Sequence, residues 1–223
     1  MLDISELLGP DQPGIRLIEA TSLVGSATTH GTSGQLGNAT DSALFAAMRE
    51  WADVIVVAAG TVEAEDYGGV AKPSTARIAA VTRSLSLSAD SNFFRVTTPP
   101  LVLCPDVALD SPKAQVLREA GAELVGVGDG GVEEIVAALH ARGFRRLVVE
   151  GGPHLYAGFI AAGLVDKFYL TVDPHLSPSV ETPLVNPAFL DSGADSIVPM
   201  ELENVQADGD GTVFLRYRRR PTA

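Results

Sequence analysis

Short apolar runs alternate along the chain with amphipathic stretches. Strands are predicted at 15–20, 53–59, 76–82, 100–104, 122–127, 146–150, 167–173 and 212–218. The runs in the middle of the chain consist almost entirely of Val, Ile and Leu, which is typical of strands covered on both faces. The pattern therefore predicts a buried sheet with other elements packed above and below it.

Helices are predicted between these strands. Residues 40–52 place Leu44, Phe45, Met48 and Trp51 on one face, with Thr40 as the expected cap. Other helices are expected to begin at Pro112, Val132 and Pro153 and to end near Gly121, Gly143 and Gly163. This alternation predicts an α/β fold with a mostly parallel central sheet and helices on both faces.

The last two predicted strands, 167–173 and 212–218, have no helix between them. We therefore expect an antiparallel edge at the C-terminal side of the sheet, with 174–211 forming loop and one short strand. Residues 1–223 are expected to form one domain, in which 1–13 is a flexible N-terminal segment.

Composition narrows the class of protein. No apolar run approaches the roughly 20 residues of a membrane span, and no signal-peptide pattern opens the sequence. The formal net charge of −12 argues against nucleic acid or an anionic membrane as a partner. The single cysteine, Cys104, excludes an internal disulfide and a thiolate metal cluster, and it favours a reducing cytoplasm.

Metal chemistry is not indicated elsewhere. His30, His140, His154 and His175 show no metal-ligand spacing with acidic residues, so we expect no metal site.

Two predicted strands end in glycine. In VVAAGTVEAED (56–66), Gly60 could let a ligand approach the backbone, or it could begin an ordinary turn with Thr61 as a helix cap. In VVEGGPHL (148–155), Gly151 and Gly152 precede a helix that begins with Pro153. Glu150 is then either a fixed carboxylate beside a ligand or a solvated acid in a turn.

Two further segments allow two interpretations each. GVGDGG (126–131) fits the dinucleotide fingerprint, with Glu150 about twenty residues on, but four predicted strands precede it and a plain turn explains it better. Thr82-Arg83-Ser84 follows the third strand. Its guanidinium could bind the 2′-phosphate of NADP, although isolated loop arginines are common.

Together, ATSLVGSATTHGTSG (20–34), DVIVVAAGTVEAEDYG (53–68), ARIAAVTRSL (76–85) and VVEGGPHLYAGFIAAGLVDKFYLTVDPHL (148–176) resemble the reductase domain of bacterial riboflavin biosynthesis. That domain is the C-terminal half of a bifunctional deaminase–reductase, and its fold is similar to dihydrofolate reductase. The segments occur in the family's order and cover most of the chain.

The resemblance implies NADPH-dependent reduction of 5-amino-6-(5-phosphoribosylamino)uracil by hydride transfer to ribose C1′. It assigns the cofactor to Gly60, Thr61, Glu65, Thr82, Arg83, Gly151, Gly152, Pro153, His154 and Leu155. It assigns the substrate to Ser33, Arg49 and Glu150. It also implies a homodimer, for which the apolar segment KFYLTV (167–172) is a plausible seam. It identifies no catalytic acid.

The sequence departs from the family pattern at two positions. Val24 stands where an aspartate is expected in SLDG, and Ala58 replaces a glycine in VGAGT. The deaminase half, with its zinc site, is expected to be absent. Two alternatives remain open: an NAD(P)H oxidoreductase of the same fold with a different substrate, and a non-catalytic relative that binds NADP or a pyrimidine.

Overall fold

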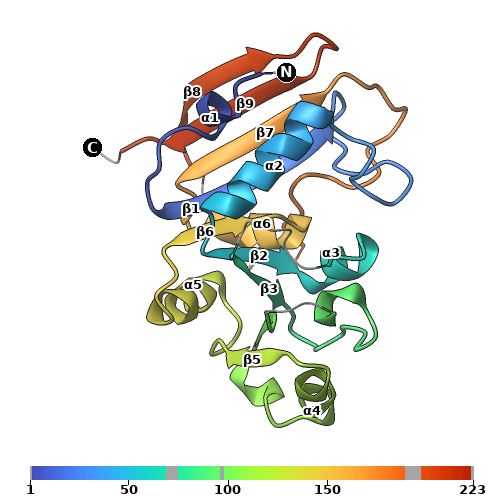
Figure 1. The fold of residues 1–223 in the computed structure, drawn as a ribbon, viewed down its shortest axis with the longest axis vertical. Coiled ribbons are helices and arrows are strands. Elements are labelled where there is room, and N and C mark those ends of the chain that lie inside the picture. The colour runs from blue at the N-terminus through green and yellow to red at the C-terminus, as the bar shows by residue number, and fades with distance from the viewer. Residues whose placement is uncertain (1, 69–74, 96–97, 189–196, 222–223) are drawn as a thin grey trace.

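The computed structural model describes residues 2–68, 75–95, 98–188 and 197–221. Over these residues, nine strands form one sheet in the order β5-β4-β3-β2-β6-β1-β7-β9-β8 (Figure 1). The strands are β1 (Gly14–Ser22), β2 (Val54–Ala58), β3 (Arg77–Val81), β4 (Leu101–Cys104), β5 (Glu123–Gly126), β6 (Arg146–Val149), β7 (Lys167–Asp173), β8 (Met200–Ala207) and β9 (Val213–Arg219). Strands β1 to β7 pair in parallel, whereas β9 is antiparallel to both β7 and β8.

Helices cover both faces of this sheet. They are α1 (Ile4–Leu8), α2 (Ala39–Trp51), α3 (Ala59–Ala64), α4 (Pro112–Glu119), α5 (Val132–Ala141) and α6 (Pro153–Ala161), with 3₁₀ turns at Asn92–Phe94 and Asp106–Ala108. Side chains of α1 to α4 pack with one face of the sheet into a single apolar cluster, and those of α5 and α6 pack with the other face into a second. The predicted three-layer α/β fold with an antiparallel C-terminal edge is therefore confirmed.

The structure corrects two details of the sequence interpretation. Helix α2 is capped by Asn38, whose side chain accepts hydrogen bonds from the amides of Thr40 and Asp41, and not by Thr40. The KFYLTV segment is β7, which pairs with β1 and β9 and so lies inside the sheet. Its backbone groups are already used, so this strand offers no free edge for a dimer seam.

The N-terminal segment, expected to be flexible, contains α1. Leu7 is 3% exposed, and the carbonyl of Leu8 accepts hydrogen bonds from the Tyr169 hydroxyl (2.7 Å) and from Arg16 (3.2 Å). The carbonyls of Glu6 and Leu7 accept from Arg216 (2.5 and 2.6 Å). Buried side chains of the sheet thus hold the helix in place.

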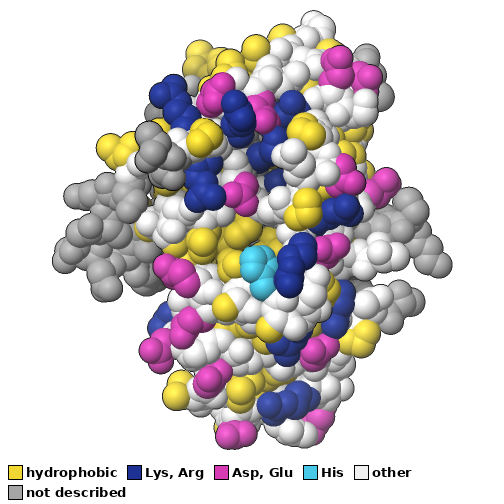
Figure 2. Space-filling view, turned by 90° about the vertical axis from the view of Figure 1, so that its left-hand side faces the viewer, with side chains coloured by type: hydrophobic (Ala, Val, Ile, Leu, Met, Phe, Trp, Pro, Cys, Tyr) yellow, Lys and Arg dark blue, Asp and Glu magenta, His cyan; other side chains and the backbone are white. Residues whose placement is uncertain are grey.

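On the face drawn in Figure 2, acidic and basic side chains are interspersed, and hydrophobic side chains lie between them near the middle. Among the described helices, none is long and apolar enough to cross a bilayer.

The parallel strands bring their carboxyl ends to one edge of the sheet. The end of β6 continues beside β2, because the Glu150 amide donates to the Val56 carbonyl (3.0 Å) and the Ala58 amide donates to the Gly151 carbonyl (2.8 Å). Ligands of open α/β sheets bind at such an edge. The two glycine-bearing segments of the sequence therefore lie next to one another.

We predict that Arg16→Met destabilises the protein and releases α1. Arg16 is 1% exposed, donates to the carbonyls of Leu8 and Pro10, and stacks 3.6 Å from the centroid of the Trp51 ring. The substitution removes the Arg16 hydrogen bonds to both carbonyls and leaves the Leu8 carbonyl with Tyr169 alone, which should lower the free energy of unfolding by about 2–3 kcal/mol. Denaturant titration measures this loss, and limited proteolysis should show faster cleavage within residues 1–13.

The matched control is Arg146→Met, whose guanidinium pairs with Asp11 at 3.1 Å while 37% of the arginine side chain is exposed. This surface pair should contribute less than about 1 kcal/mol. Equal stability of the two variants would contradict the structural role of Arg16.

Candidate active site

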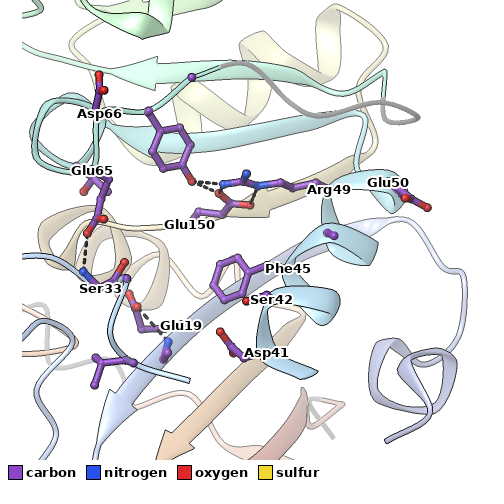
Figure 3. Close-up of a pocket in the computed structure, with 17 residues that line it drawn as sticks. Glu19, Ser33, Asp41, Ser42, Phe45, Arg49, Glu50, Glu65, Asp66 and Glu150 are labelled. Atoms are coloured by element: carbon purple, nitrogen blue, oxygen red, sulfur yellow. Dashed lines mark hydrogen bonds and ion pairs between the residues drawn. The ribbon is translucent and has the colours of Figure 1, made fainter. Parts of the chain in front are cut away.

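A cavity of about 530 Å³ lies at the carboxyl edge of the sheet, beside α2 (Figure 3). A second cavity of about 180 Å³ adjoins it on the side of α6. The two cavities share five lining residues, which are Glu19, Ser33, Thr61, Glu65 and Glu150. These residues mark the junction at which molecules bound in the two cavities would meet.

An ion pair between α2 and the end of β6 closes one side of the larger cavity. Arg49 donates from Nε to Glu150 Oε1 (2.9 Å) and from Nη2 to Oε2 (2.7 Å), a bidentate arrangement. The Glu150 side chain is 1% exposed and that of Arg49 30%. The Tyr67 hydroxyl contacts the same carboxylate and accepts from Arg49 (2.8 Å).

Arg49, Tyr67 and Glu150 shift one another's protonation through their charges and hydrogen bonds. Burial by itself would lower the pKa of Arg49, but the hydrogen bonds and charge of Glu150 outweigh it and raise that pKa above its ordinary value. Burial, together with the charge of Glu150, also raises the pKa of Tyr67 well above its usual range. Arg49 and Tyr67 therefore stay protonated at any physiological pH.

Glycines shape the smaller cavity. A Cβ placed on Gly152 would lie 2.9 Å from Thr61 Oγ1, and one on Gly151 would lie 3.8 Å from Glu19 Oε2. The peptide between these glycines is cis. Gly60 and Pro153 line the same cavity. Side chains at these positions would occupy the space, so the sequence keeps the backbone open to a flat ligand.

Ser33 and Glu65 connect the loop after β1 to the end of α3. The Ser33 amide donates to Glu65 Oε1 at 2.7 Å, and both residues line both cavities. Eight of the thirteen residues assigned from the sequence line the smaller cavity: Ser33, Gly60, Thr61, Glu65, Glu150, Gly151, Gly152 and Pro153. Arg49 joins Ser33 and Glu150 at the larger one.

The remaining assigned residues lie outside the two cavities. Thr82 and Arg83 follow β3 at the same edge of the sheet, and Arg83 lies beside Gly130, where an added Cβ would be 3.3 Å from its Nη1. The His154 ring contacts the Asn186 carbonyl (2.9 Å), and Leu155 is 7% exposed within the apolar cluster. Their cofactor contacts stay predictions.

The GVGDGG segment follows β5, the edge strand of the sheet. The amides of Asp129 and Gly131 both donate to Glu134 Oε2 at 3.0 Å. A carboxylate of the chain itself thus occupies the position in which a dinucleotide fingerprint would hold a pyrophosphate. The geometry favours the turn interpretation.

The structure adds cavity residues that sequence reasoning missed. Glu19 and Asp41 line the larger cavity with Phe45 and Tyr67. In Figure 3, Phe45 lies between the Arg49–Glu150 pair and Asp41. Asp41 is 7% exposed, and its Oδ1 has no hydrogen-bond partner within the described part of the chain. Burial raises the pKa of Asp41 to about 6, and the charge of Asp173 adds to this effect.

One signal could have identified Glu19. It is the one carboxyl in IRLIEA (15–20), a segment predicted to be a buried strand, where burying an unpaired acid costs free energy. Asp41 and Tyr67 carried no comparable pattern. Val24 and Ala58, the two departures from the family pattern, line neither cavity. Within the described ranges, no group of three or more His, Cys, Asp or Glu side chains could hold a metal ion.

Comparison with solved structures defines the class of fold. The chain superposes on dihydrofolate reductase from Enterococcus faecalis, which was solved with NADP(H), with a TM-score of 0.54, 14% identity, and coverage of 93% of this chain and 97% of that one. The architecture is dihydrofolate reductase-like.

Sequence comparison then defines the family. The model of the RibD C-terminal domain matches residues 13–214, and the chain belongs to this family of reductases. A pyrimidine reductase-like protein from Corynebacterium diphtheriae is 31% identical with a TM-score of 0.83, over 95% of this chain and 94% of that one. A Thermotoga maritima deaminase/5-amino-6-(5-phosphoribosylamino)uracil reductase is 20% identical with a TM-score of 0.73, over 93% of this chain but 57% of that one.

We predict that Glu150→Gln destabilises the protein because it leaves the partly buried Arg49 guanidinium without its carboxylate. The free energy of unfolding should fall by about 2–4 kcal/mol. In a double-mutant cycle with Arg49→Met, the coupling energy should exceed about 1 kcal/mol. Glu123→Gln serves as the control, because its 2.9 Å pair with Arg77 leaves 45% of the glutamate side chain exposed and should cost less than about 1 kcal/mol. Additive losses in the cycle would refute the coupling.

Proposed function

We propose that this protein reduces 5-amino-6-(5-phosphoribosylamino)uracil to its ribitylamino product, with NADPH as the hydride donor. The observation that carries the proposal is the meeting of two cavities at Glu150, one lined by glycines and one closed by a fixed ion pair. Membership of the RibD C-terminal domain family supports the reaction class. We further propose that it is a homodimer, as the family resemblance implies, and that it works in the reducing cytoplasm that the single cysteine favours.

The smaller cavity fits a nicotinamide ring. Gly60, Gly151 and Gly152 leave the backbone accessible, and Thr61, Glu65 and Pro153 complete the lining. Bound NADPH would supply the hydride in this arrangement. Thr82 and Arg83, at the end of β3, would hold the adenosine phosphate, because a guanidinium can bind two phosphate oxygens at once. His154 and Leu155 would flank the cofactor from α6.

The larger cavity fits the substrate. Ser33, Arg49 and Glu150 lie on its walls, and Phe45 offers an aromatic face for a pyrimidine. The chain's own contribution is mainly positional, because fixing two reactants in alignment removes much of the entropic barrier. The rigid Arg49–Glu150 pair provides a wall that does not reorganise during the reaction.

One observation favours a second candidate, an NAD(P)H oxidoreductase of this fold that acts on a substrate without a phosphate. Six acidic residues line the larger cavity, which are Glu19, Asp41, Glu50, Glu65, Asp66 and Glu150. Among its described lining residues Arg49 is the only Lys or Arg, and it is paired with Glu150. Like charges oppose the binding of a phosphate dianion, whereas a neutral or cationic heterocycle suits this lining.

We predict that the purified protein oxidises NADPH when 5-amino-6-(5-phosphoribosylamino)uracil is added. The loss of NADPH absorbance and mass spectrometry of the ribitylamino product measure the reaction. Faster turnover of the dephosphorylated substrate would favour the second candidate. NADPH binding without turnover of either compound would indicate a non-catalytic relative, and absence of NADPH binding would refute the proposed function.

Gly152→Ala should weaken NADPH binding about tenfold or more. The new methyl group would lie 2.9 Å from Thr61 Oγ1, within the space proposed for the nicotinamide, while the Gly152 backbone (φ −87°) is open to alanine. Fluorescence titration measures the dissociation constant. Gly209→Ala, where nothing lies within 4 Å of the added Cβ, should bind NADPH like the parent protein. If Gly152→Ala and the parent protein bound NADPH with equal affinity, the placement of the cofactor in this cavity would be wrong.

A further inference from the structure

Glu19 lies at the junction of the cavities. It is one of the five residues that line both the larger and the smaller cavity. Its Oε2 lies 3.8 Å from the position of a Cβ on Gly151, and Thr61 Oγ1 lies 3.9 Å from the same point. On the proposed function, this is the place where the nicotinamide and the reacting carbon of the substrate would meet.

The other acids of the junction are already engaged. Both oxygens of Glu150 accept hydrogen bonds from Arg49, which keeps its carboxylate in an ion pair. Glu65 Oε1 accepts the Ser33 amide at 2.7 Å. Glu19, in contrast, has no cationic partner among the described contacts: Oε1 accepts the amide of the adjacent Ala20 at 3.1 Å.

The surroundings of Glu19 favour its neutral form. On one side, the Glu19 side chain lines an apolar cavity of about 220 Å³ together with Leu17, Tyr156 and Phe168. On the other side, the carboxyls of Asp41 and Glu150 face it as like charges. Removal from water is the main cause that raises the pKa of Glu19, to about 8; it outweighs the hydrogen bond from the Ala20 amide, which lowers the pKa, and the two neighbouring carboxyls add to it.

Tyr156 is compatible with a protonated Glu19. A hydrogen bond from its hydroxyl to the Glu19 carboxyl would lower the pKa of Glu19, but the hydroxyl donates its proton to the Ile18 carbonyl at 2.5 Å. The phenolic oxygen keeps lone pairs that can accept a hydrogen bond from a carboxylic acid. Burial also raises the pKa of Tyr156 well above its usual range. The phenol therefore stays protonated, and no phenolate is present that could take the proton of Glu19.

We propose that the Glu19 carboxylic acid is the proton donor of the reduction. The proposal rests on the function proposed above and deepens it by assigning the acid. When hydride reaches C1′ of the ring-opened substrate, the C1′–H bond forms and the electron pair of the C1′=N bond moves to nitrogen. The Glu19 O–H bond breaks as the N–H bond forms, and water entering the open cavity returns a proton to the carboxylate. One hydride and one proton are consumed for each amine produced.

The test compares the parent protein, Glu19→Gln and Glu133→Gln, with NADPH and 5-amino-6-(5-phosphoribosylamino)uracil as probes. Glutamine keeps the size and polarity of the side chain but has no acidic proton. Single-turnover rates of the parent should be constant at neutral pH and fall about tenfold per pH unit above about pH 8. Glu19→Gln should be about 10²–10⁴-fold slower, without this alkaline decline and with unchanged NADPH affinity. Glu133, exposed on α5, should be replaceable without effect.

A second measurement is independent of turnover. With ¹³C-labelled glutamate, the carboxyl resonance that disappears in Glu19→Gln should titrate near pH 8. Titration near the ordinary value of 4.5, or an unchanged alkaline decline in Glu19→Gln, would overturn the proposal while leaving the reductase function intact. A parent protein that binds NADPH but does not reduce the substrate would overturn the proposed function, and the role of Glu19 with it.

Discussion

The ion pair between Arg49 and Glu150 is the interaction on which the site depends. It joins the last turn of α2 to the end of the central strand β6, so one contact fixes the distance between the helical layer and the sheet at the cavity. A bidentate pair with a fully buried carboxylate has one favourable geometry. Tyr67 adds a third polar contact and brings the end of the α3 segment to the same point. The same ion pair that positions the cavity walls therefore also stabilises the fold.

Two glutamates at this edge of the sheet have opposite environments. Glu150 faces a guanidinium and a phenol, which hold a negative charge in place. Glu19 faces an apolar cavity and two other acids, which disfavour a second charge. The proposed reaction transfers a hydride and a proton, and it would use Glu150 as a fixed carboxylate and Glu19 as a neutral acid. Environments that separate the protonation states of nearby carboxyls are a general means of assigning acid and base roles.

Much of this could be predicted from the sequence, and the limits have physical causes. Continuous Val and Ile runs and glycine or proline at element ends carry local signals, so strands and helices were placed to within a few residues. VVEGGP was recognisable because glycine beside a strand end is a backbone property. Asp41 and Tyr67 were missed because their roles arise only when α2 and the end of α3 converge on β6. The KFYLTV segment was misjudged as a dimer seam because the pairing partners of a strand depend on the order of the whole sheet.

Val24 raised the question of whether the chain had lost a carboxyl that the reaction needs. In the structure Val24 lines neither cavity, whereas Glu19, five residues earlier on the same strand and its continuation, lines both. A carboxyl within β1, against Leu17 and Tyr156, is desolvated and can remain protonated. Glu19 thus has apolar side chains on one side and the cavity that admits water on the other, which fits its proposed role as a proton donor that water reprotonates.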